Sequence, residues 1–292
     1  MNKTRFEEAK EIMMSSDFID DVDKLEEILR EYSDISDNSK ALEYLDNKIM
    51  PSKLGNLKIG EDTIVMNENH GLNCFSDKMG YCENCNQCYG KKAPITYPNS
   101  FLFNLSAEIN FNRLSVDEII GSIETSYKSE LEAKKLKFMR FSEMGDFKSF
   151  ELFLKANEVA KHLYNEYGII SYTYTHNKDL LQYKEAIKNS YIVVNWSIEA
   201  GNGFKHAITC NDVSKLSNYF SQPEKYVICQ GKCRNCSYCK NKDDLRTVVF
   251  VNHFSESMEK GLEAGLTETQ LKELEAKKYI DYGVFLMKLN EE

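Results

Sequence analysis

Apolar residues recur at three- and four-residue intervals in the first fifty positions of the chain, with charged residues between them. The clearest series is Phe18, Val22, Leu25, Ile28 and Leu29. This spacing places apolar side chains on one face of an amphipathic helix. We therefore expect residues 1–50 to form an N-terminal helical extension.

Farther along the chain, short runs of β-branched and aromatic residues replace this pattern, and such runs are typical of strands. The predicted strands are Phe101–Leu105, Lys137–Phe141, Ile169–Thr175, Ile192–Trp196, Tyr226–Ile228 and Thr247–Val251. A short hairpin between residues 53 and 66 is expected to precede them.

Helical patterns separate the predicted strands. They cover residues 115–135, 149–166 and 178–189, and a last helix is expected to begin at residue 267. The first opens with Ser115 and Glu118, which are spaced as a capping box. Strands that alternate with helices indicate an α/β fold with a mostly parallel sheet. We expect a partial (β/α) barrel-like sheet in residues 51–292.

Composition and charge narrow the range of partners. The chain has 292 residues, of which 42% are apolar, so it can bury a large core without covalent staples. Residues 1–50 contain 14 acidic and 7 basic residues, which leaves a charge of only −2 on the rest from the total of −9. No broad cationic surface is predicted, so nucleic acid is not expected as the main partner.

The sequence near residue 1 is polar and acidic, unlike the apolar core of a secretory signal. No run approaches the roughly 18 apolar residues of a membrane span. We therefore expect a cytoplasmic protein without a membrane partner, in a reducing compartment where thiolates are available to metals.

Eight of the nine cysteines fall into two tight groups. The first group is Cys74, Cys82, Cys85 and Cys88, and the second is Cys229, Cys233, Cys236 and Cys239. The C-x2-C spacing brings two sulfurs onto one side of a tight turn, where they can bind one centre. The clustering predicts metal binding rather than a disulfide framework.

Three consecutive short turns that each present a sulfur resemble the C-x2-C-x2-C run of ferredoxins more than the paired knuckles of zinc ribbons. The sequence therefore favours one or two [4Fe–4S] clusters, and zinc stays the alternative because thiolates suit both metals. Four thiolates around either centre leave a charge of −2, which the nearby Lys232, Arg234 and Lys240 can offset. Whether the two groups form one site or two is open.

Polar residues follow several predicted strands, and in parallel sheets ligands bind beyond the carboxyl ends of the strands. The candidate cofactor-binding residues are Glu143, Gly145, Asp146, Thr175, His176, Ser197 and Glu199, with Asn104 and His253 in similar positions. Taken one at a time, Asp146 is equally well explained as a helix cap and His176 as a surface histidine. Cys229 directly follows Tyr226–Ile228, which places the second cysteine group at the same edge.

Several segments together resemble a family of phage and mobile-element proteins called gene-product-eighty-eight-like. They are Lys53-Leu54-Gly55, Cys85-x2-Cys88-Tyr89, Arg140-x4-Gly145-Asp146-Phe147, Ser171 to Thr175, and Cys229-x3-Cys233-x2-Cys236-x2-Cys239. The likeness covers about residues 51–254. The family is in turn similar to radical S-adenosylmethionine enzymes, whose three-cysteine loop leaves one iron of a [4Fe–4S] cluster open.

This resemblance implies an iron–sulfur protein with a radical-S-adenosylmethionine-like barrel, as a redox or radical enzyme of unknown substrate. It would bind S-adenosylmethionine as a small-molecule cofactor and need an electron donor. Cys82 lies three residues before Cys85 rather than the four of the enzyme loop, and Cys229-x3-Cys233-x2-Cys236 has the enzyme spacing. The alternative is a non-catalytic zinc protein that acts through protein or nucleic-acid contacts.

Overall fold

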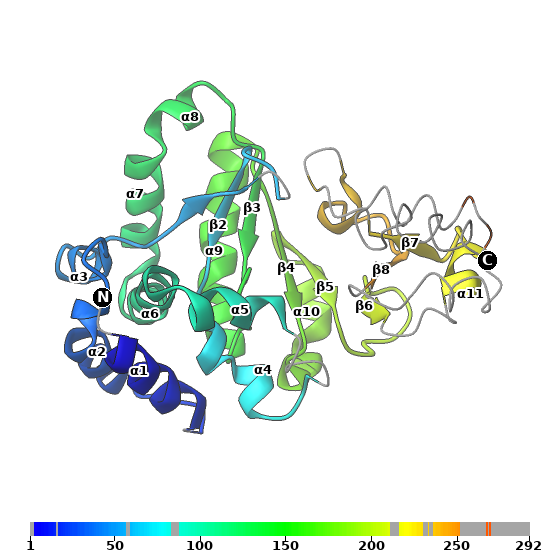
Figure 1. The fold of residues 1–292 in the computed structure, drawn as a ribbon. Coiled ribbons are helices and arrows are strands. Elements are labelled where there is room, and N and C mark those ends of the chain that lie inside the picture. Colours follow the sequence, from blue (N-terminus) through cyan, green and yellow to red (C-terminus); the bar gives the residue numbers. More distant parts are fainter. Residues whose placement is uncertain are drawn as a thin grey trace, which may run out of the picture. The chain divides into compact units, whose positions relative to one another are not determined.

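The computed structural model describes residues 3–15, 17–56, 59–82, 88–210, 216–229, 233, 236–251, 267 and 269. The chain divides into two compact units (Figure 1). The first unit comprises Met1–Gly55 and Glu61–Val194, and the second comprises Asn56–Gly60 and Asn195–Glu292. Predictions for Cys85, Lys232, Arg234, His253 and the final helix lie outside the described residues.

The first fifty residues form helices, as predicted from their apolar spacing. These are α1 (Lys3–Ser15), α2 (Val22–Glu31), the 3-10 turn η1 (Ser33–Ile35) and α3 (Ala41–Asp46). Their apolar faces pack around α6 (Pro98–Arg113) in one buried cluster that includes Leu25, Leu29, Phe101 and Leu105. Burial of this shared apolar area is what holds the helices to the first unit.

Helix α6 corrects the predicted strand Phe101–Leu105. Pro98 stands in its first turn, where the missing N–H costs nothing. Phe101, Leu102, Leu105 and Ile109 then recur at helical spacing and are all buried. Since the helix is buried on nearly all sides, its sequence lacks the polar stripe that distinguishes an amphipathic helix from a strand. Asn104 therefore lies inside a helix and not beyond a strand.

A mostly parallel five-stranded sheet forms the frame of the first unit. Its strands are β1 (Lys53–Leu54), β2 (Thr63–Met66), β3 (Phe138–Phe141), β4 (Ile170–Thr175) and β5 (Ile192–Trp196), in the order β1-β2-β3-β4-β5. The hairpin of β1 and β2 is antiparallel, and β2, β3 and β4 are parallel. The predicted strands at 137–141, 169–175 and 192–196 are confirmed.

Helices connect these strands much as the sequence pattern predicted. The connections are α7 (Val116–Ser126), α8 (Lys128–Glu132), α9 (Phe150–Tyr167), the 3-10 segment η4 (Lys178–Tyr183) and α10 (Lys184–Lys188). The Ser115 capping box at the start of α7 is present with both of its hydrogen bonds. The loop after β2 carries three further short elements, η2 (Gly71–Asn73), α4 (Phe75–Lys78) and α5 (Tyr89–Thr96).

The second unit contains a smaller parallel sheet. Its strands are β6 (Ala207–Cys210), β7 (Tyr226–Ile228) and β8 (Thr247–Val251) in the order β6-β8-β7, with α11 (Leu216–Phe220) and the 3-10 turn η7 (Tyr238–Lys240) between them. The two predicted strands are confirmed. The sequence pattern missed β6, because its β-branched run is only Ile208-Thr209, and pairing of all four residues with β8 completes the strand. None of the helices in the described part of the chain has the length and apolarity to cross a bilayer.

Candidate functional site

The loop that leaves β2 begins with buried polar side chains that bond to neighbouring elements. Asn67 donates to Asn104 Oδ1 at 2.7 Å and accepts from the Met144 N–H at 3.1 Å. Glu68 accepts from the Ser142 N–H at 3.1 Å and from the Ser142 hydroxyl. The first two residues after β2 therefore fix this loop to α6 and to the loop that follows β3.

Glu108, in the middle of α6, accepts three hydrogen bonds from the next part of the same loop. Asn69 Nδ2, Asn73 Nδ2 and the His70 N–H each lie 2.8 Å from its carboxyl oxygens. Burial raises the pKa of Glu108 to about 8 against the lowering effect of these donors, and burial likewise raises the pKa of Glu68 to about 8. Both carboxyls therefore titrate near neutrality.

His70 is held as a neutral imidazole. The Leu72 N–H donates to Nδ1 at 3.1 Å, so the proton resides on Nε2, which lies 3.1 Å from the Phe101 carbonyl. Burial lowers the pKa of His70 to about 3. These contacts complete a rigid frame for the chain just before Cys74.

Asp146 joins three segments at the carboxyl edge of the sheet. Its buried carboxylate accepts from the Ser76 hydroxyl at 2.7 Å, the Thr175 hydroxyl at 2.8 Å and the His176 N–H at 2.7 Å. Burial raises the pKa of Asp146, while the three donors lower it. Asp146, Thr175 and His176, predicted from separate strand ends, are thus brought into direct contact, and Ser76 connects them to the cysteine-bearing loop.

Two glycines allow the loops at this edge to touch through their backbones. Gly145 has φ +82°, and a Cβ there would lie 2.6 Å from the Asn69 carbonyl oxygen. A Cβ on Gly71 would overlap the carbonyl of Gly90. A side chain at either position would push apart the loops that carry Cys74, Cys88 and Asp146.

Three described cysteines of the first group lie at this edge. Burial raises the pKa of the Cys74 thiol well above its usual value, and nearby Asp146 and Cys88 raise it further. Burial also raises the pKa of Cys88, with a smaller effect from Cys82. The His176 side chain hydrogen-bonds to Cys82. A metal would have to displace protons from these thiols, and the sulfur donors fit iron–sulfur or zinc chemistry.

Glu143 is nearly buried and forms an ion pair with Lys53 of β1, with 2.6 Å between Lys53 Nζ and Glu143 Oε2. Ser197 and Glu199, by contrast, belong to the second unit. There they line a cavity of about 720 Å³ together with residues that precede β6, β7 and β8. Glu143, Gly145, Asp146, Thr175 and His176 thus belong to the first unit, while Ser197 and Glu199 follow β5 just beyond the unit boundary, which falls inside that strand.

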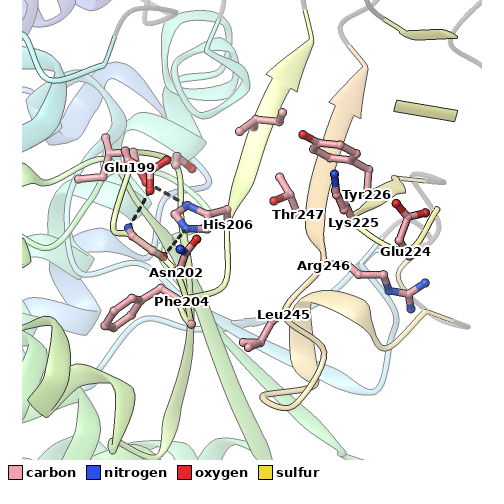
Figure 2. Close-up of a pocket in the computed structure, with 15 residues that line it drawn as sticks. Glu199, Asn202, Phe204, His206, Glu224, Lys225, Tyr226, Leu245, Arg246 and Thr247 are labelled. Carbon is pink, nitrogen blue, oxygen red and sulfur yellow. Dashed lines mark hydrogen bonds between the residues drawn. The ribbon is translucent and has the colours of Figure 1, made fainter. Parts of the chain in front are cut away.

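The cavity in the second unit has two walls of different character (Figure 2). One is the loop from Ser197 to His206, in which Gly201 N–H donates to Glu199 at 2.8 Å. The ring nitrogens of His206 lie 3.2 Å from the carbonyls of Ile198 and Gly201. Lys225 and Arg246 lie on the opposite wall. The loop is thus held from within by one carboxylate and one imidazole.

The second cysteine group follows β7. The Cys229 N–H donates to Val249 at 2.8 Å and extends the ladder with β8, and the Cys236 N–H donates to the Cys233 carbonyl at 3.2 Å. Asn195 Nδ2 donates to the Cys239 carbonyl at 3.0 Å. Strand pairing and the end of β5 thus hold the backbone on both sides of the group.

Two lysines are buried beside this group. Lys205, 5% exposed, donates to the Asp244 carbonyl, and Lys240, 4% exposed, donates to the Cys233 carbonyl at 3.0 Å. Burial lowers the pKa of Lys205, while Cys239 and Asp244 oppose that effect. Buried ammonium groups are rare unless an anion lies close.

The described side chains do not gather three or more Cys, His, Asp or Glu residues in an arrangement ready to hold a metal. The cysteine ligands therefore stay predictions. No protein-family model, curated protein or solved structure matches the chain.

Sequence reasoning missed Glu68, Glu108 and Lys205. The run Asn67-Glu68-Asn69-His70 directly follows a short strand, so the rule applied to the other strand ends would have selected Glu68. Glu108 had no such signal, because it lies beyond the predicted strand Phe101–Leu105 and the rest of α6 was not predicted as a helix. Lys205 precedes β6, a four-residue strand that was too short to be predicted from the sequence.

Proposed function

We propose that this chain is an iron–sulfur protein whose first cysteine group holds a [4Fe–4S] cluster at the carboxyl edge of the sheet, in the manner of radical S-adenosylmethionine enzymes. The observation that carries the proposal is the junction at Asp146. Through Ser76, Thr175 and His176 it fixes the cysteine loop against the ends of β3 and β4. Ligand sites of parallel sheets lie at this edge.

The order of the strands supports a partial barrel. From β2 to β5 each new strand is added beside the one before it, always in the same direction across the sheet. Right-handed crossovers then place the connecting helices on one face, which is the arrangement of a (β/α) barrel rather than of a doubly wound sheet. The other face would be concave and would line a cofactor site.

Cys82, Cys85 and Cys88 would bind three irons in this proposal, and a bound cluster would supply one-electron chemistry. His176 would donate a hydrogen bond to the Cys82 sulfur, a contact that tunes cluster potentials. Asp146 would hold His176 in place through its backbone N–H. Glu143, Gly145 and Thr175 would face the small-molecule cofactor at the same edge, with S-adenosylmethionine as the expected molecule.

The proposal assigns the second group to a fully ligated centre, because Cys239 provides a fourth thiolate. Such a centre would transfer electrons or support structure. The alternative function is a zinc protein without catalysis, in which both groups hold Zn²⁺. Its donor set of thiolates is equally suitable for that metal.

The test is the content of iron, zinc and acid-labile sulfide in anaerobically purified protein, with Cys85→Ala and Cys236→Ala variants. We expect each variant to lose one cluster of about four irons and four sulfides. Zinc without sulfide in the parent protein would refute the iron–sulfur proposal. If clusters are present, S-adenosylmethionine should alter their electron paramagnetic resonance spectrum in the parent protein, and an unchanged spectrum would exclude cofactor binding.

A further inference from the structure

Lys205 is a buried cation for which the described part of the second unit provides no ion pair with a carboxylate. Its Nζ donates to a backbone carbonyl, that of Asp244, and no described carboxylate forms an ion pair with it. An ammonium group loses several kcal/mol of hydration free energy when it is buried. A single hydrogen bond to a neutral carbonyl does not compensate for that loss. Burial of Lys205 as a cation is therefore favourable only where an anion lies close.

Asp244 is the nearest candidate, but its carboxylate is already bound to Arg246. Arg246 Nε lies 3.0 Å from Asp244 Oδ1 and its Nη2 lies 2.7 Å from Oδ2, in a two-point contact. The guanidinium also stacks over the ring of Tyr238 at 4.7 Å from the ring centre. A bidentate pair of this kind is strong and neutralises both groups. The carboxylate of Asp244 is therefore paired with Arg246 rather than with Lys205.

Among the described residues, the sulfurs of Cys239 and Cys236 in the second cysteine group also act on Lys205. Neutral thiols cannot balance an ammonium, whereas thiolates bound to a metal can. A second buried cation, Lys240, bonds to the backbone of the same group at Cys233. The two lysines come from separate parts of the chain and meet the same group of cysteines.

We propose that Lys205 and Lys240 are the buried counter-charges of a four-thiolate metal centre formed by Cys229, Cys233, Cys236 and Cys239, with a net charge of −2. The inference rests on metal binding at this group, as in the proposed function, but not on the identity of the metal. Four thiolates carry −4, and either Zn²⁺ or a [4Fe–4S]²⁺ core brings the sum to −2. Two lysines match that charge.

The proposal gives Lys205 a defined effect on metal affinity. The positive charge of Lys205 stabilises the metal-bound centre. In the metal-free unit the same charge is buried without an anion and destabilises the fold. Both contributions are lost when the lysine is replaced by methionine, which keeps the length and the apolar stem of the side chain. We expect the affinity for metal to fall by about 10- to 100-fold, the usual range for residues that support metal ligands.

The experiment uses the full chain with the first group silenced by Cys82→Ser and Cys88→Ser. Cobalt(II) is titrated in against a chelator of known affinity, and its visible spectrum counts the bound thiolates. The Lys205→Met variant should bind cobalt about 10- to 100-fold more weakly with an unchanged four-thiolate spectrum. Lys225→Met removes an exposed lysine of the same unit and should stay within about twofold of the parent.

Equal affinity in Lys205→Met and the parent would overturn the proposal, and so would a parent protein that binds no cobalt. If Lys205→Met does not fold, judged by its Trp196 fluorescence, the same comparison is made with Lys240→Met, where an unchanged affinity is equally decisive. The result also separates the two proposals. A zinc-bound native protein refutes the iron–sulfur function, whereas the affinity ratio still measures the role of Lys205.

Discussion

The two units hold their cysteine groups in different ways. In the first unit, buried polar side chains bond to one another around the loop that carries Cys74. Glu108 accepts three hydrogen bonds from this loop, and Asp146 accepts one from it and two from the end of β4. In the second unit, the buried cation Lys205 has a backbone carbonyl as its acceptor and thiols as its neighbours. The first group therefore sits on a frame that is complete without metal.

The difference concerns when each site becomes ordered. A loop fixed by internal hydrogen bonds is already in place before a metal arrives, so binding costs little further conformational entropy. A site whose charges balance only after metal binding couples the metal to folding. We therefore expect metal removal to leave the first unit folded and to loosen the second.

The largest expected effect is on the pH dependence of the first unit. Glu68 and Glu108 have pKa values near 8 in the folded unit against 4.5 when exposed, so the folded state keeps protons that the unfolded state has lost. Stability must therefore fall as the pH rises from about 5 to 8, by on the order of 4 kcal/mol for each group.

His70 has the opposite effect, because its pKa of about 3 lies below the usual 6.5 and stability is lost as the pH falls through that interval. The two carboxyls together outweigh the single histidine above their unfolded pKa of 4.5, so urea unfolding followed by far-ultraviolet circular dichroism should show a stability maximum near pH 4.5. Glu108→Gln should reduce the slope above pH 6, and a slope equal to that of the parent would contradict the assignment.

A second prediction concerns backbone contact at the same loops. Gly145→Ala should destabilise the first unit by about 3 kcal/mol, since the new Cβ meets the Asn69 carbonyl and φ is positive. Gly121→Ala is the matched control, because Gly121 lies inside α7 with open space around it, and it should be neutral or stabilising. Thermal unfolding of both variants makes the comparison, and equal losses would show that the contact is not specific.

A smaller effect is expected when Asp146 keeps its shape but loses its charge. Asp146→Asn retains one acceptor oxygen but places an NH₂ group against donors, so about 1–3 kcal/mol of stability should be lost. The hydrogen exchange of the His176 amide should rise in this variant, while the Cys229 amide in the second unit stays protected. Equal exchange at both amides would mean that the two units do not respond separately.

The smallest effect should follow the loss of the ion pair between Lys53 and Glu143. Lys53 is 43% exposed and Glu143 only 2%, so Lys53→Met removes a half-screened partner from a buried carboxylate and should cost about 1 kcal/mol. The loss should shrink further in 0.5 M salt. A loss above about 2 kcal/mol that persists in high salt would indicate a tighter role for the pair than its exposure allows.

The sequence predicted most of the sheet because its strands combine β-branched residues with clear turn signals, as in Ile192–Trp196. It failed at α6, where apolar residues on all sides erase the helical period, and at β6, whose β-branched run of two residues is too short to predict a strand without its pairing with β8. Asp146, Thr175 and His176 were found because strand ends in a parallel sheet share an edge. Ser197 satisfies the same rule because it directly follows β5, although the boundary between the two units falls inside that strand, which a strand-end rule cannot predict.

The order β1-β2-β3-β4-β5 also has a consequence for the growing chain on the ribosome. Each strand can pair with the neighbour that was synthesised just before it, so the first unit can assemble progressively without waiting for distant sequence. By the time Thr175 and His176 emerge, every partner of Asp146 has been made. The loop that carries Cys74 can therefore close against the sheet before the ribosome has translated Cys229.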